Sequence, residues 1–313
     1  MKILIIDPVH KILPDLLIEN GHDILIDLAQ SYDYYLELIP EYEGIIIRSG
    51  IKIDKAFIDH AQKLKFIARV GAGMENIDVA YAENKNIICI NSPEGNRTAV
   101  GEQAIGMLLS LFNNLNKADQ EVRQAQWNRE ANRGIELEGK RVGIIGYGNM
   151  GSAFAQRLIG FDVEVIAFDK YKTNYSDEYV RETSMEELFE KSDIISIHLP
   201  LNEETAYLIN EEWISKFKKD FYLVNTARGP IVKTDDLVKA LENGKIKGAC
   251  LDVLEYEKLG FENIDKDNLP TAFQYLSNSS KVILSPHIAG WTHESNYKLS
   301  RVIADKILGL FNN

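Results

Sequence analysis

Polar side chains follow three apolar segments in the second half of the chain. One segment ends in Asn225 shortly before Arg228, a second ends in Asp252 with Glu257 five residues further on, and a third is followed by His287. The ligand crevice of an open α/β sheet lies at the carboxyl ends of its strands, so we expect these groups to converge. A guanidinium group can bind a carboxylate, and an imidazole can exchange a proton near neutral pH. The set can therefore hold an anion and move a proton.

A glycine-rich segment precedes these groups. Residues 146–151 read Gly-Tyr-Gly-Asn-Met-Gly, the G-x-G-x-x-G pattern. The pattern alone is weak, but here it lies between a predicted strand over 141–145 and a predicted helix over 150–159. Its three glycines allow, in order, a tight turn, close approach of a pyrophosphate, and packing of the helix on the strand. The segment therefore predicts a dinucleotide site at a helix N-terminus, where free N–H groups attract phosphate.

The residue that ends the next predicted strand distinguishes between the two nicotinamide cofactors. This strand, over 163–169, ends in Asp169, 23 residues after Gly146. A carboxylate there can accept hydrogen bonds from the ribose hydroxyls and would repel a 2′-phosphate. The sequence therefore favours NAD over NADP, although Lys170 and Lys172 weaken that preference.

Short apolar segments alternate with helix-like segments along most of the chain, which indicates parallel strands joined by crossover helices. The predicted strands are 2–7, 23–27, 44–49, 66–70, 87–91, 141–145, 163–169, 193–199, 222–227, 248–253 and 281–285. We predict an α/β fold of two doubly wound domains. A smaller, flavodoxin-like substrate domain comprises 1–97 and 291–313, and a Rossmann NAD-binding domain comprises 98–290. We also expect one long helix over 98–126, a last helix over 294–311, and an irregular loop over 258–280.

The composition excludes some classes of function. The net charge of −12 and the pI of about 5.1 argue against nucleic acid or an anionic membrane as the main partner. No apolar stretch reaches the length of a membrane span, and the N-terminus lacks the features of a secretory signal, so a cytoplasmic protein is expected. Cys89 and Cys250 lie in apolar segments and are expected to be small buried side chains. No cluster has the spacing of a metal site.

These motifs, in this order, resemble those of the D-isomer-specific 2-hydroxyacid dehydrogenase family. The matching segments are 146–151, 198–201 followed by Thr205, 225–229, Asp252 with Glu257, 285–287, and in the first domain 70–78 and 91–93. The resemblance covers essentially the whole chain. It implies an NAD-dependent enzyme that acts on a small 2-hydroxy or 2-keto acid in a cleft between its domains, and a homodimer.

The resemblance also implies the catalytic roles. Arg228 would hold the substrate carboxylate in its planar fork. His287 would be the general acid and base, and Glu257 would orient it and favour its protonated form. A solvated loop carboxylate is the alternative for Glu257, because Lys258 follows it where the family commonly has proline. Asp252 would contact the nicotinamide end of the cofactor.

Further cofactor contacts follow from the same resemblance. They are expected from Gly146, Tyr147, Gly148, Asn149, Met150, Gly151, Asp169, His198, Pro200, Thr205, Thr226, Ala227, Asp252 and Gly290. His198 is interpreted as a cofactor-edge or structural residue rather than a catalytic one. Trp291 could either line the substrate pocket or begin the last helix.

Two loops of the first domain are expected to bind the substrate through backbone N–H groups. They are Ser49-Gly50-Ile51 and Gly71-Ala72-Gly73, where small residues let a ligand approach the backbone. Arg48 and Arg69 precede them. In the phosphoglycerate dehydrogenases of the family, arginines at similar places help to bind phosphate. The alternative is that one or both arginines pair with nearby acids.

The predicted function is therefore oxidation or reduction of D-3-phosphoglycerate and 3-phosphohydroxypyruvate. The alternatives are a glyoxylate, hydroxypyruvate or D-lactate-type reductase and, from another class, an NAD-sensing regulator that binds a partner. The 30 residues from Glu257 to His287 exceed the usual family spacing, and this insertion is expected to reshape either the substrate pocket or the subunit contact. The chain ends 26 residues after His287, so feedback by serine through an additional domain is not expected.

Overall fold

The computed structural model describes residues 1–257 and 269–311. Contacts between Cα atoms divide the chain into two compact units. Unit 1 is Met1–Arg97 with Trp291–Asn313, and unit 2 is Thr98–Gly290.

Unit 1 contains a parallel sheet of five strands in the order β2-β1-β3-β4-β5, which is the flavodoxin-like order. Its strands are β1 Lys2–Ile5, β2 Asp23–Ile26, β3 Gly44–Ile47, β4 Phe66–Arg69 and β5 Ile88–Ile90. Its helices are α1 Ile12–Glu19, α2 Tyr32–Leu38, η1 Ile39–Glu41, α3 Lys55–His60, α4 Val79–Asn84 and α12 His293–Phe311. The strand order reverses between β1 and β3, so a ligand crevice is expected where these two strands end.

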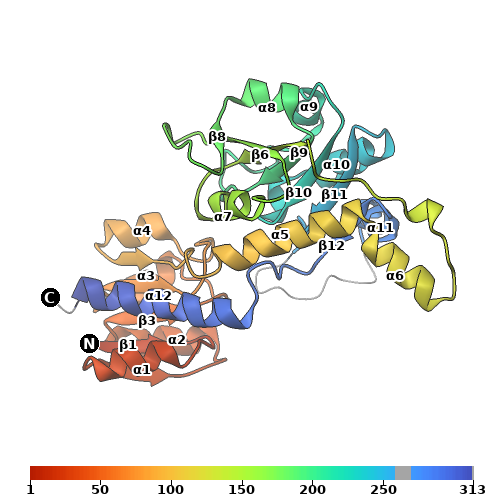
Figure 1. Ribbon diagram of the computed structural model, residues 1–313. Helices are drawn as coiled ribbons and strands as arrows, with labels where there is room; N and C mark the ends of the chain where they lie inside the picture. Colours follow the sequence, from red (N-terminus) through yellow and green to blue (C-terminus); the bar gives the residue numbers. More distant parts are fainter. Residues whose placement is uncertain (258–268, 312–313) are drawn as a thin grey trace. The chain divides into compact units, whose positions relative to one another are not determined.

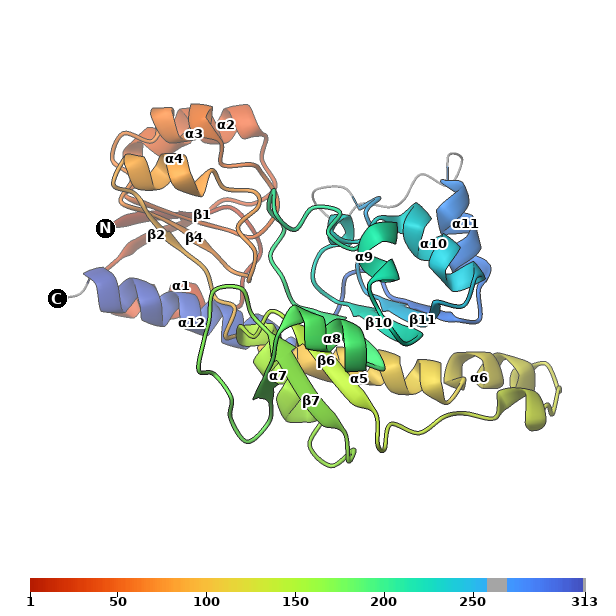
Figure 2. The same ribbon diagram turned by 90° about the horizontal axis from the view of Figure 1, so that it is seen from above.

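Helices cover both faces of this sheet (Figure 2). On one face α1 packs beside α12, and Leu13 and Ile303 from these helices are buried with Phe66 of the sheet. On the other face α2, α3 and α4 contribute Tyr35 and Phe57 to a second cluster. Burial on both faces explains the nearly continuous apolar character of β3.

Unit 2 contains a parallel sheet of seven strands in the order β12-β11-β10-β9-β6-β7-β8. Its strands are β6 Arg141–Ile145, β7 Glu164–Phe168, β8 Arg181–Glu182, β9 Ile194–Ile197, β10 Phe221–Asn225, β11 Ile246–Leu251 and β12 Val282–Leu284. Its helices are α5 Arg97–Phe112, α6 Leu115–Arg123, η2 Glu130–Asn132, α7 Asn149–Arg157, α8 Met185–Lys191, α9 Glu211–Ser215, η3 Gly229–Ile231, α10 Thr234–Glu242 and α11 Thr271–Asn278. The reversal between β6 and β9 is that of a Rossmann fold.

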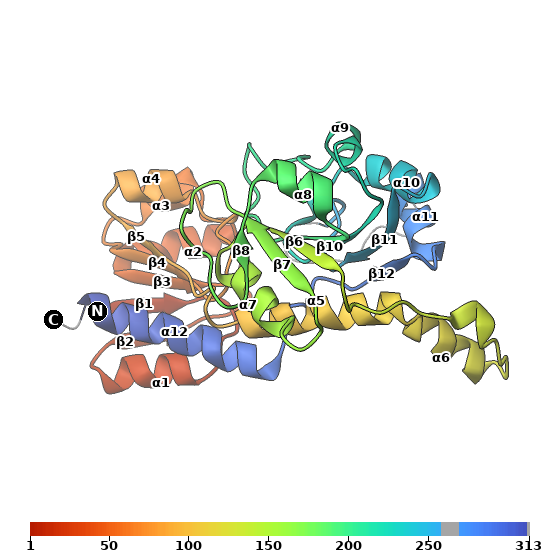
Figure 3. The same cartoon turned by 45° about the horizontal axis from the view of Figure 1, so that its top comes forward.

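Two helical layers enclose this sheet (Figure 3). On one face α5 and α7 bury Leu108 and Phe154. On the other face α8, α9, α10 and α11 bury Trp213, Leu237 and Leu276. The predicted α/β class with two doubly wound sheets is confirmed, and each predicted strand agrees with the structure to within two residues at either end.

Three details of the sequence-based prediction were wrong. The helix predicted over 98–126 is two helices, because Asn114 adopts a left-handed φ of 52° and ends the continuous hydrogen bonding between α5 and α6 (Figure 1). The loop predicted over 258–280 contains α11, while residues 258–268 lie outside the described residues. The two-residue strand β8 was not predicted, because so short a segment has no apolar alternation to recognise.

Candidate functional site

The register of the seven-stranded sheet places the predicted site residues of unit 2 along one edge. Phe168, Ile145, Ile197, Asn225, Leu251 and Leu284 form one row of paired residues across the sheet. The next residue along each strand is Asp169, Gly146, His198, Thr226, Asp252 and Ser285, respectively. Parallel pairing therefore brings together residues that lie up to 139 positions apart in the sequence.

The three glycines of the loop have distinct steric surroundings. Gly146 has a φ of +90°, and a Cβ there would lie 2.5 Å from the carbonyl oxygen of His198. A Cβ on Gly151 would overlap the carbonyl oxygen of Gly146. A Cβ on Gly148, the N-cap residue of α7, would meet no protein atom within 4 Å. Gly146 and Gly151 are thus required by the fold itself, whereas Gly148 leaves open space at the helix N-terminus, as a pyrophosphate would need.

Asp169 holds the glycine loop in place. Its Oδ2 accepts the N–H of Tyr147 at 2.8 Å, and its Oδ1 accepts the N–H groups of Tyr171 and Lys172. The two lysines near it are engaged elsewhere, since Nζ of Lys172 donates to the Tyr147 carbonyl and Nζ of Lys170 donates to Glu204. Both lysine side chains therefore have partners within the protein and are less available to attract a 2′-phosphate.

His198 follows β9, and its imidazole is a neutral internal group. Nε2 lies 2.8 Å from Oγ of Ser196, and Nδ1 is shielded from solvent and has no hydrogen-bond partner among residues 1–257 and 269–311. Burial lowers the pKa of His198 to about 3. Nearby, the buried Thr205 hydroxyl donates to the carbonyl of the exposed Pro200 at 2.6 Å and fixes the turn after β9.

The segment after β10 carries the predicted substrate arginine. Arg228 is partly buried, and its Nη1 donates to the carbonyl of Ala227 at 2.7 Å. The side chain of Asn225 binds the backbone at both Ala227 and Arg228. A Cβ on Gly229 would overlap the backbone of Leu254, so this glycine permits the close approach of the two loops that carry Arg228 and Glu257. The Thr226 hydroxyl is buried and has no partner in the described residues, which leaves it available to a cofactor.

The predicted pair of Glu257 and His287 is formed. Oε2 of Glu257 lies 2.7 Å from Nδ1 of His287, and both side chains are about one quarter exposed. The other carboxylate oxygen of Glu257 accepts the N–H of Leu254 at 2.5 Å. Both oxygens of Glu257 are thus in use, and Nε2 of His287 is the ring nitrogen at the opposite edge from the carboxylate. The geometry does not fit a solvated loop carboxylate at this position.

Asp252 anchors the loop that carries His287. Its Oδ1 accepts the Ser285 hydroxyl at 2.6 Å and the N–H of Ile288 at 2.9 Å, and its Oδ2 accepts the N–H of Ala289 at 2.9 Å. Its carbonyl accepts the N–H of His287, whose φ of +54° is left-handed. Asp252 is 1% exposed. A cofactor contact at Asp252 is predicted from the sequence, whereas this anchoring is not, because it arises only when the two strand ends lie side by side.

In unit 1 the first predicted substrate loop differs from the expectation. The backbone N–H groups of Ser49 and Gly50 donate to Oδ2 of Asp7 at 3.1 and 3.2 Å, and that of Arg48 donates to the same atom. These N–H groups bind an internal carboxylate, a partner that the prediction of Ser49 and Gly50 as substrate contacts did not include. Asp7 was missed, although it follows the first strand as Asp169 and Asp252 follow theirs.

The two arginines of unit 1 lie beside these loops. Nε of Arg69 donates to the carbonyl of Arg48 at 2.9 Å, and a Cβ on Gly71 would lie 2.5 Å from Nη1 of Arg69. The Arg48 guanidinium lies 4.7 Å from the centre of the Trp291 ring. Trp291 precedes α12 and is 68% exposed, so it neither begins the helix nor is enclosed within unit 1. In the second loop, Asn91 fixes the carbonyl of Ala72 at 2.7 Å, and Gly73 is partly exposed.

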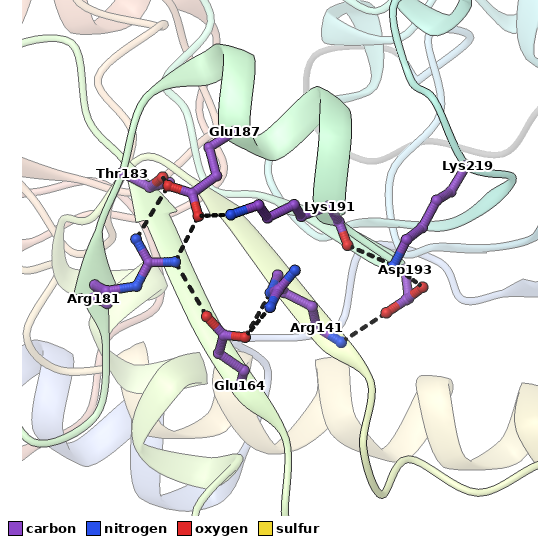
Figure 4. A network of polar contacts seen from close by, with 8 residues as sticks. All are labelled: Arg141, Glu164, Arg181, Thr183, Glu187, Lys191, Asp193 and Lys219. Atoms are coloured by element: carbon purple, nitrogen blue, oxygen red, sulfur yellow. Dashed lines mark hydrogen bonds and ion pairs between the residues drawn. The ribbon is translucent and has the colours of Figure 1, made fainter.

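A separate ionic network lies at the opposite edge of the unit 2 sheet (Figure 4). Arg181 of β8 bridges Glu187 of α8 and Glu164 of β7, and Glu164 also pairs with Arg141 of β6. The pKa of the Glu187 carboxyl is held well below its usual range by hydrogen bonds from Arg181, Thr183 and Lys191. Arg141, Glu164 and Arg181 begin their strands, so the network fastens the short edge strand and is remote from the glycine loop.

The described part of the chain comprises residues 1–257 and 269–311. No group of three or more His, Cys, Asp or Glu side chains in these ranges is arranged to hold a metal ion. None of the helices in these ranges is both long and apolar enough to cross a membrane.

The reversal of strand order with a glycine loop at that point defines unit 2 as a dinucleotide-binding α/β domain of the kind found in dehydrogenases. A family model described as the NAD-binding domain of D-isomer specific 2-hydroxyacid dehydrogenases matches residues 105–289. The chain belongs to this family, and the resemblance stated from the sequence is confirmed.

Curated relatives agree with this family and differ in their named substrates. The chain is 32% identical over 99% of its length to a D-3-phosphoglycerate dehydrogenase of Archaeoglobus fulgidus. It is 34% identical over 96% of its length to a hydroxypyruvate reductase of Thermotoga maritima. A crystal structure of D-lactate dehydrogenase from Aquifex aeolicus with NAD and lactic acid is 27% identical, with a TM-score of 0.83 over 100% of this chain and 96% of that one.

The share of each relative that is matched differs. The alignment spans 57% of the phosphoglycerate dehydrogenase but 95% of the hydroxypyruvate reductase. The chain therefore spans little more than half the length of the first relative, and that relative's whole activity does not transfer by identity alone.

Proposed function

We propose that the protein is an NAD-dependent dehydrogenase that interconverts a small D-2-hydroxy acid and the corresponding 2-keto acid. The observation that carries this proposal is the 2.7 Å contact between Glu257 and His287, on the same sheet edge as Arg228 and the glycine loop. A fold that bound NAD for a structural purpose would have no need of a carboxylate-oriented imidazole at that edge.

The residues of unit 2 fit NAD. Gly148 leaves open space at the N-terminus of α7, and the carboxylate of Asp169 lies beside the glycine loop. The Thr226 hydroxyl is buried and has no partner in the part of the chain that the structure describes. Bound NAD would supply the hydride chemistry at the substrate carbon. Pro200, Thr205, Ala227 and Gly290 complete the proposed set of cofactor contacts, and Asn149 and Met150 begin the helix that faces the phosphates.

Side chains and backbone groups of the chain would bind the substrate and transfer the proton. Arg228 would bind the carboxylate of the substrate and fix its orientation. Nε2 of His287 would donate a proton to the keto oxygen during reduction and accept it from the hydroxyl during oxidation. Glu257, fixed by the N–H of Leu254, would hold the ring in place and stabilise the imidazolium form. Gly71, Ala72 and Gly73 would offer backbone N–H groups to the substrate.

The proposed substrate pair is D-3-phosphoglycerate and 3-phosphohydroxypyruvate. Arg48 supports this, because its guanidinium is held against Trp291 and could receive a distal phosphate. Arg69 has a supporting part, since it holds the backbone of Arg48.

Reduction of a panel of 2-keto acids, followed by NADH absorbance, tests the proposal. The panel comprises 3-phosphohydroxypyruvate, hydroxypyruvate, glyoxylate and pyruvate. We expect His287→Ala to lower turnover by roughly 100-fold or more with NADH binding retained. The matched control is His60→Ala, because His60 is exposed on α3. Turnover of none of the four, or an unchanged rate in His287→Ala, would exclude the proposed mechanism.

Hydroxypyruvate or glyoxylate reduction is the second candidate. It is favoured by the match over 95% of the length of the hydroxypyruvate reductase. In this case Arg48 and Arg69 would be structural. Arg48→Gln distinguishes the two, since it should raise KM at least tenfold for the phosphorylated substrate alone if the first candidate holds.

A cytoplasmic homodimer is proposed as the assembly. No residue of α6 is buried in the single chain, and Leu115, Val122 and Trp127 are all at least half exposed. An apolar surface of this kind is typical of a contact between subunits. Light scattering of the chain and of Leu115→Glu tests it, because the charge should dissociate a dimer built on this surface.

A further inference from the structure

The carboxylate of Asp7 occupies the point where the strand order of unit 1 reverses. Asp7 follows β1, and residues 48–50 follow β3, so both lie where a flavodoxin-like sheet binds its ligand. Oδ2 of Asp7 accepts the backbone N–H groups of Arg48, Ser49 and Gly50 at 2.5, 3.1 and 3.2 Å. Asp7 is only 9% exposed. The chain itself thus supplies the anion at this position.

Three successive N–H groups that point at one oxygen form a concave site for an anion. Hydrogen bonds from N–H groups to a carboxylate are about twice as strong as those between neutral groups. Gly50 makes the arrangement possible, because a Cβ there would overlap Oδ1 of Asp7. The loop is therefore shaped around the Asp7 carboxylate, and a substrate anion would have to displace it to use these N–H groups.

Asp7 also affects the side chain of Arg48, the first residue of the loop. The Arg48 side chain is partly buried, its guanidinium lies over the Trp291 ring, and its Nη1 donates to the carbonyl of Pro8. Burial lowers the pKa of Arg48, and the charge of Asp7 opposes that change. A single carboxylate therefore fixes the backbone of Arg48 and compensates its charge.

We propose that Asp7 is a positioning residue of the substrate site. It holds residues 48–50 so that Arg48 is presented to the anionic substrate, and it keeps that substrate off the N–H groups of the loop. The substrate anion is then bound by arginine side chains and by the second loop, Gly71-Ala72-Gly73. This inference rests on the proposed function, because it names the contacts of the same substrate.

Asp7→Ala in the full chain tests the proposal, because it removes the carboxylate and leaves the three N–H groups without an acceptor. We expect KM for the 2-keto acid to rise about tenfold or more, with a smaller change in kcat and an unchanged Kd for NADH. Formate should restore KM, since it is a carboxylate small enough to enter the vacated site, whereas chloride at equal ionic strength should not. The wild type in the same formate concentration corrects for competition with substrate.

Two further variants complete the design. Asp7→Asn keeps an oxygen acceptor without the charge, so its KM should lie between those of the wild type and Asp7→Ala. Asp15→Ala, in an exposed position on α1, is the matched control and should behave as the wild type. If Asp7→Ala does not fold, the raised KM of Asp7→Asn carries the test.

A readout without turnover separates this proposal from the dehydrogenase activity. Formate should raise the Tm of Asp7→Ala more than chloride does, and by more than it raises the Tm of the wild type. A wild type that reduces no 2-keto acid removes the proposed function but leaves this binding result intact. A wild-type KM in Asp7→Ala, or equal effects of formate and chloride on it, would overturn the role of Asp7.

Discussion

The Ser285 hydroxyl donates a 2.6 Å hydrogen bond to the carboxylate of Asp252, which joins the ends of β12 and β11. The same carboxylate accepts N–H groups on the far side of His287, at Ile288 and Ala289. The loop that carries His287, the proposed acid and base, is therefore held in place by the buried carboxylate of Asp252. Its placement is a property of Asp252 as much as of Glu257.

Replacing Asp252 by Asn should destabilise the protein and lower kcat together. The amide keeps one acceptor oxygen but turns an N–H donor toward N–H donors of the loop, which costs about 2–4 kcal/mol. Urea unfolding and steady-state kinetics measure the two effects. Ser285→Ala, which loses only one of the three hydrogen bonds, should show a smaller loss of both. A weaker NADH affinity at unchanged stability would instead indicate that Asp252 acts only on the cofactor.

Glu257→Gln and His287→Ala should not have additive effects on turnover. Glu257 acts through the imidazole, so we expect kcat/KM to fall about 10- to 100-fold in Glu257→Gln and not to fall further when it is added to His287→Ala. A double-mutant cycle on kcat/KM measures this coupling. Glu242→Gln, on the exposed side of α10, serves as the control. Additive losses would show that the two residues act independently.

Gly148→Ala should weaken NADH binding without changing stability, whereas Gly151→Ala should lower stability. At Gly148 the new methyl group meets no protein atom within 4 Å, so stability should be unchanged while Kd for NADH rises about tenfold or more. At Gly151 the methyl group overlaps the carbonyl oxygen of Gly146, so Tm should fall. Thermal unfolding and NADH fluorescence titration separate the two. Unchanged NADH affinity in Gly148→Ala would place the pyrophosphate elsewhere.

His198 should make the protein sensitive to acid. Burial lowers its pKa in the folded state to about 3, below the ordinary value of 6.5, so the unfolded chain takes up a proton first as the pH falls. The stability that depends on neutral His198 is complete above pH 6.5 and is lost between about pH 6.5 and 3. By pH 4.5 the loss is about 2–3 kcal/mol. Urea unfolding against pH should show a shallower acid decline in His198→Gln, and His60→Gln should retain the wild-type decline.

Glu204→Gln should increase the affinity for NADPH while leaving that for NADH unchanged. Glu204 now holds Nζ of Lys170 at 2.7 Å and the hydroxyl of Tyr171 at 2.6 Å. Exposed ion pairs contribute up to about 1 kcal/mol, so release of Lys170 toward a 2′-phosphate should strengthen NADPH binding two- to fivefold. Fluorescence titration measures both affinities. Glu203→Gln is the matched control, and a proportional change for NADH would refute the role of Lys170.

Much of the architecture follows from local sequence patterns. Continuous β-branched segments favour strands covered on both faces, and the spacing of Gly146, Gly151 and Asp169 follows from one strand, one turn and one helix. Strand limits were less certain, because the residues at strand ends form loops whose backbone is set by contacts to other segments. The break at Asn114 escaped prediction for a related reason, since one left-handed residue leaves the apolar pattern of the two helices intact.

The sequence by itself determined the class of fold, the glycine loop and the identity of the side chains that can hold an anion and move a proton. It did so because these depend on neighbours within some thirty residues, whose spacing has a direct physical meaning. The tertiary structure alone decided how those side chains are used. Asp7 accepts the N–H of Arg48, 41 residues away, and so holds the loop after β3. Asp252 accepts the N–H of Ile288, 36 residues away, and so holds the loop that carries His287. Only the pairing of parallel strands brings these strand ends together. No local sequence pattern distinguishes a carboxylate at a strand end that binds a ligand from one that binds the backbone of the protein.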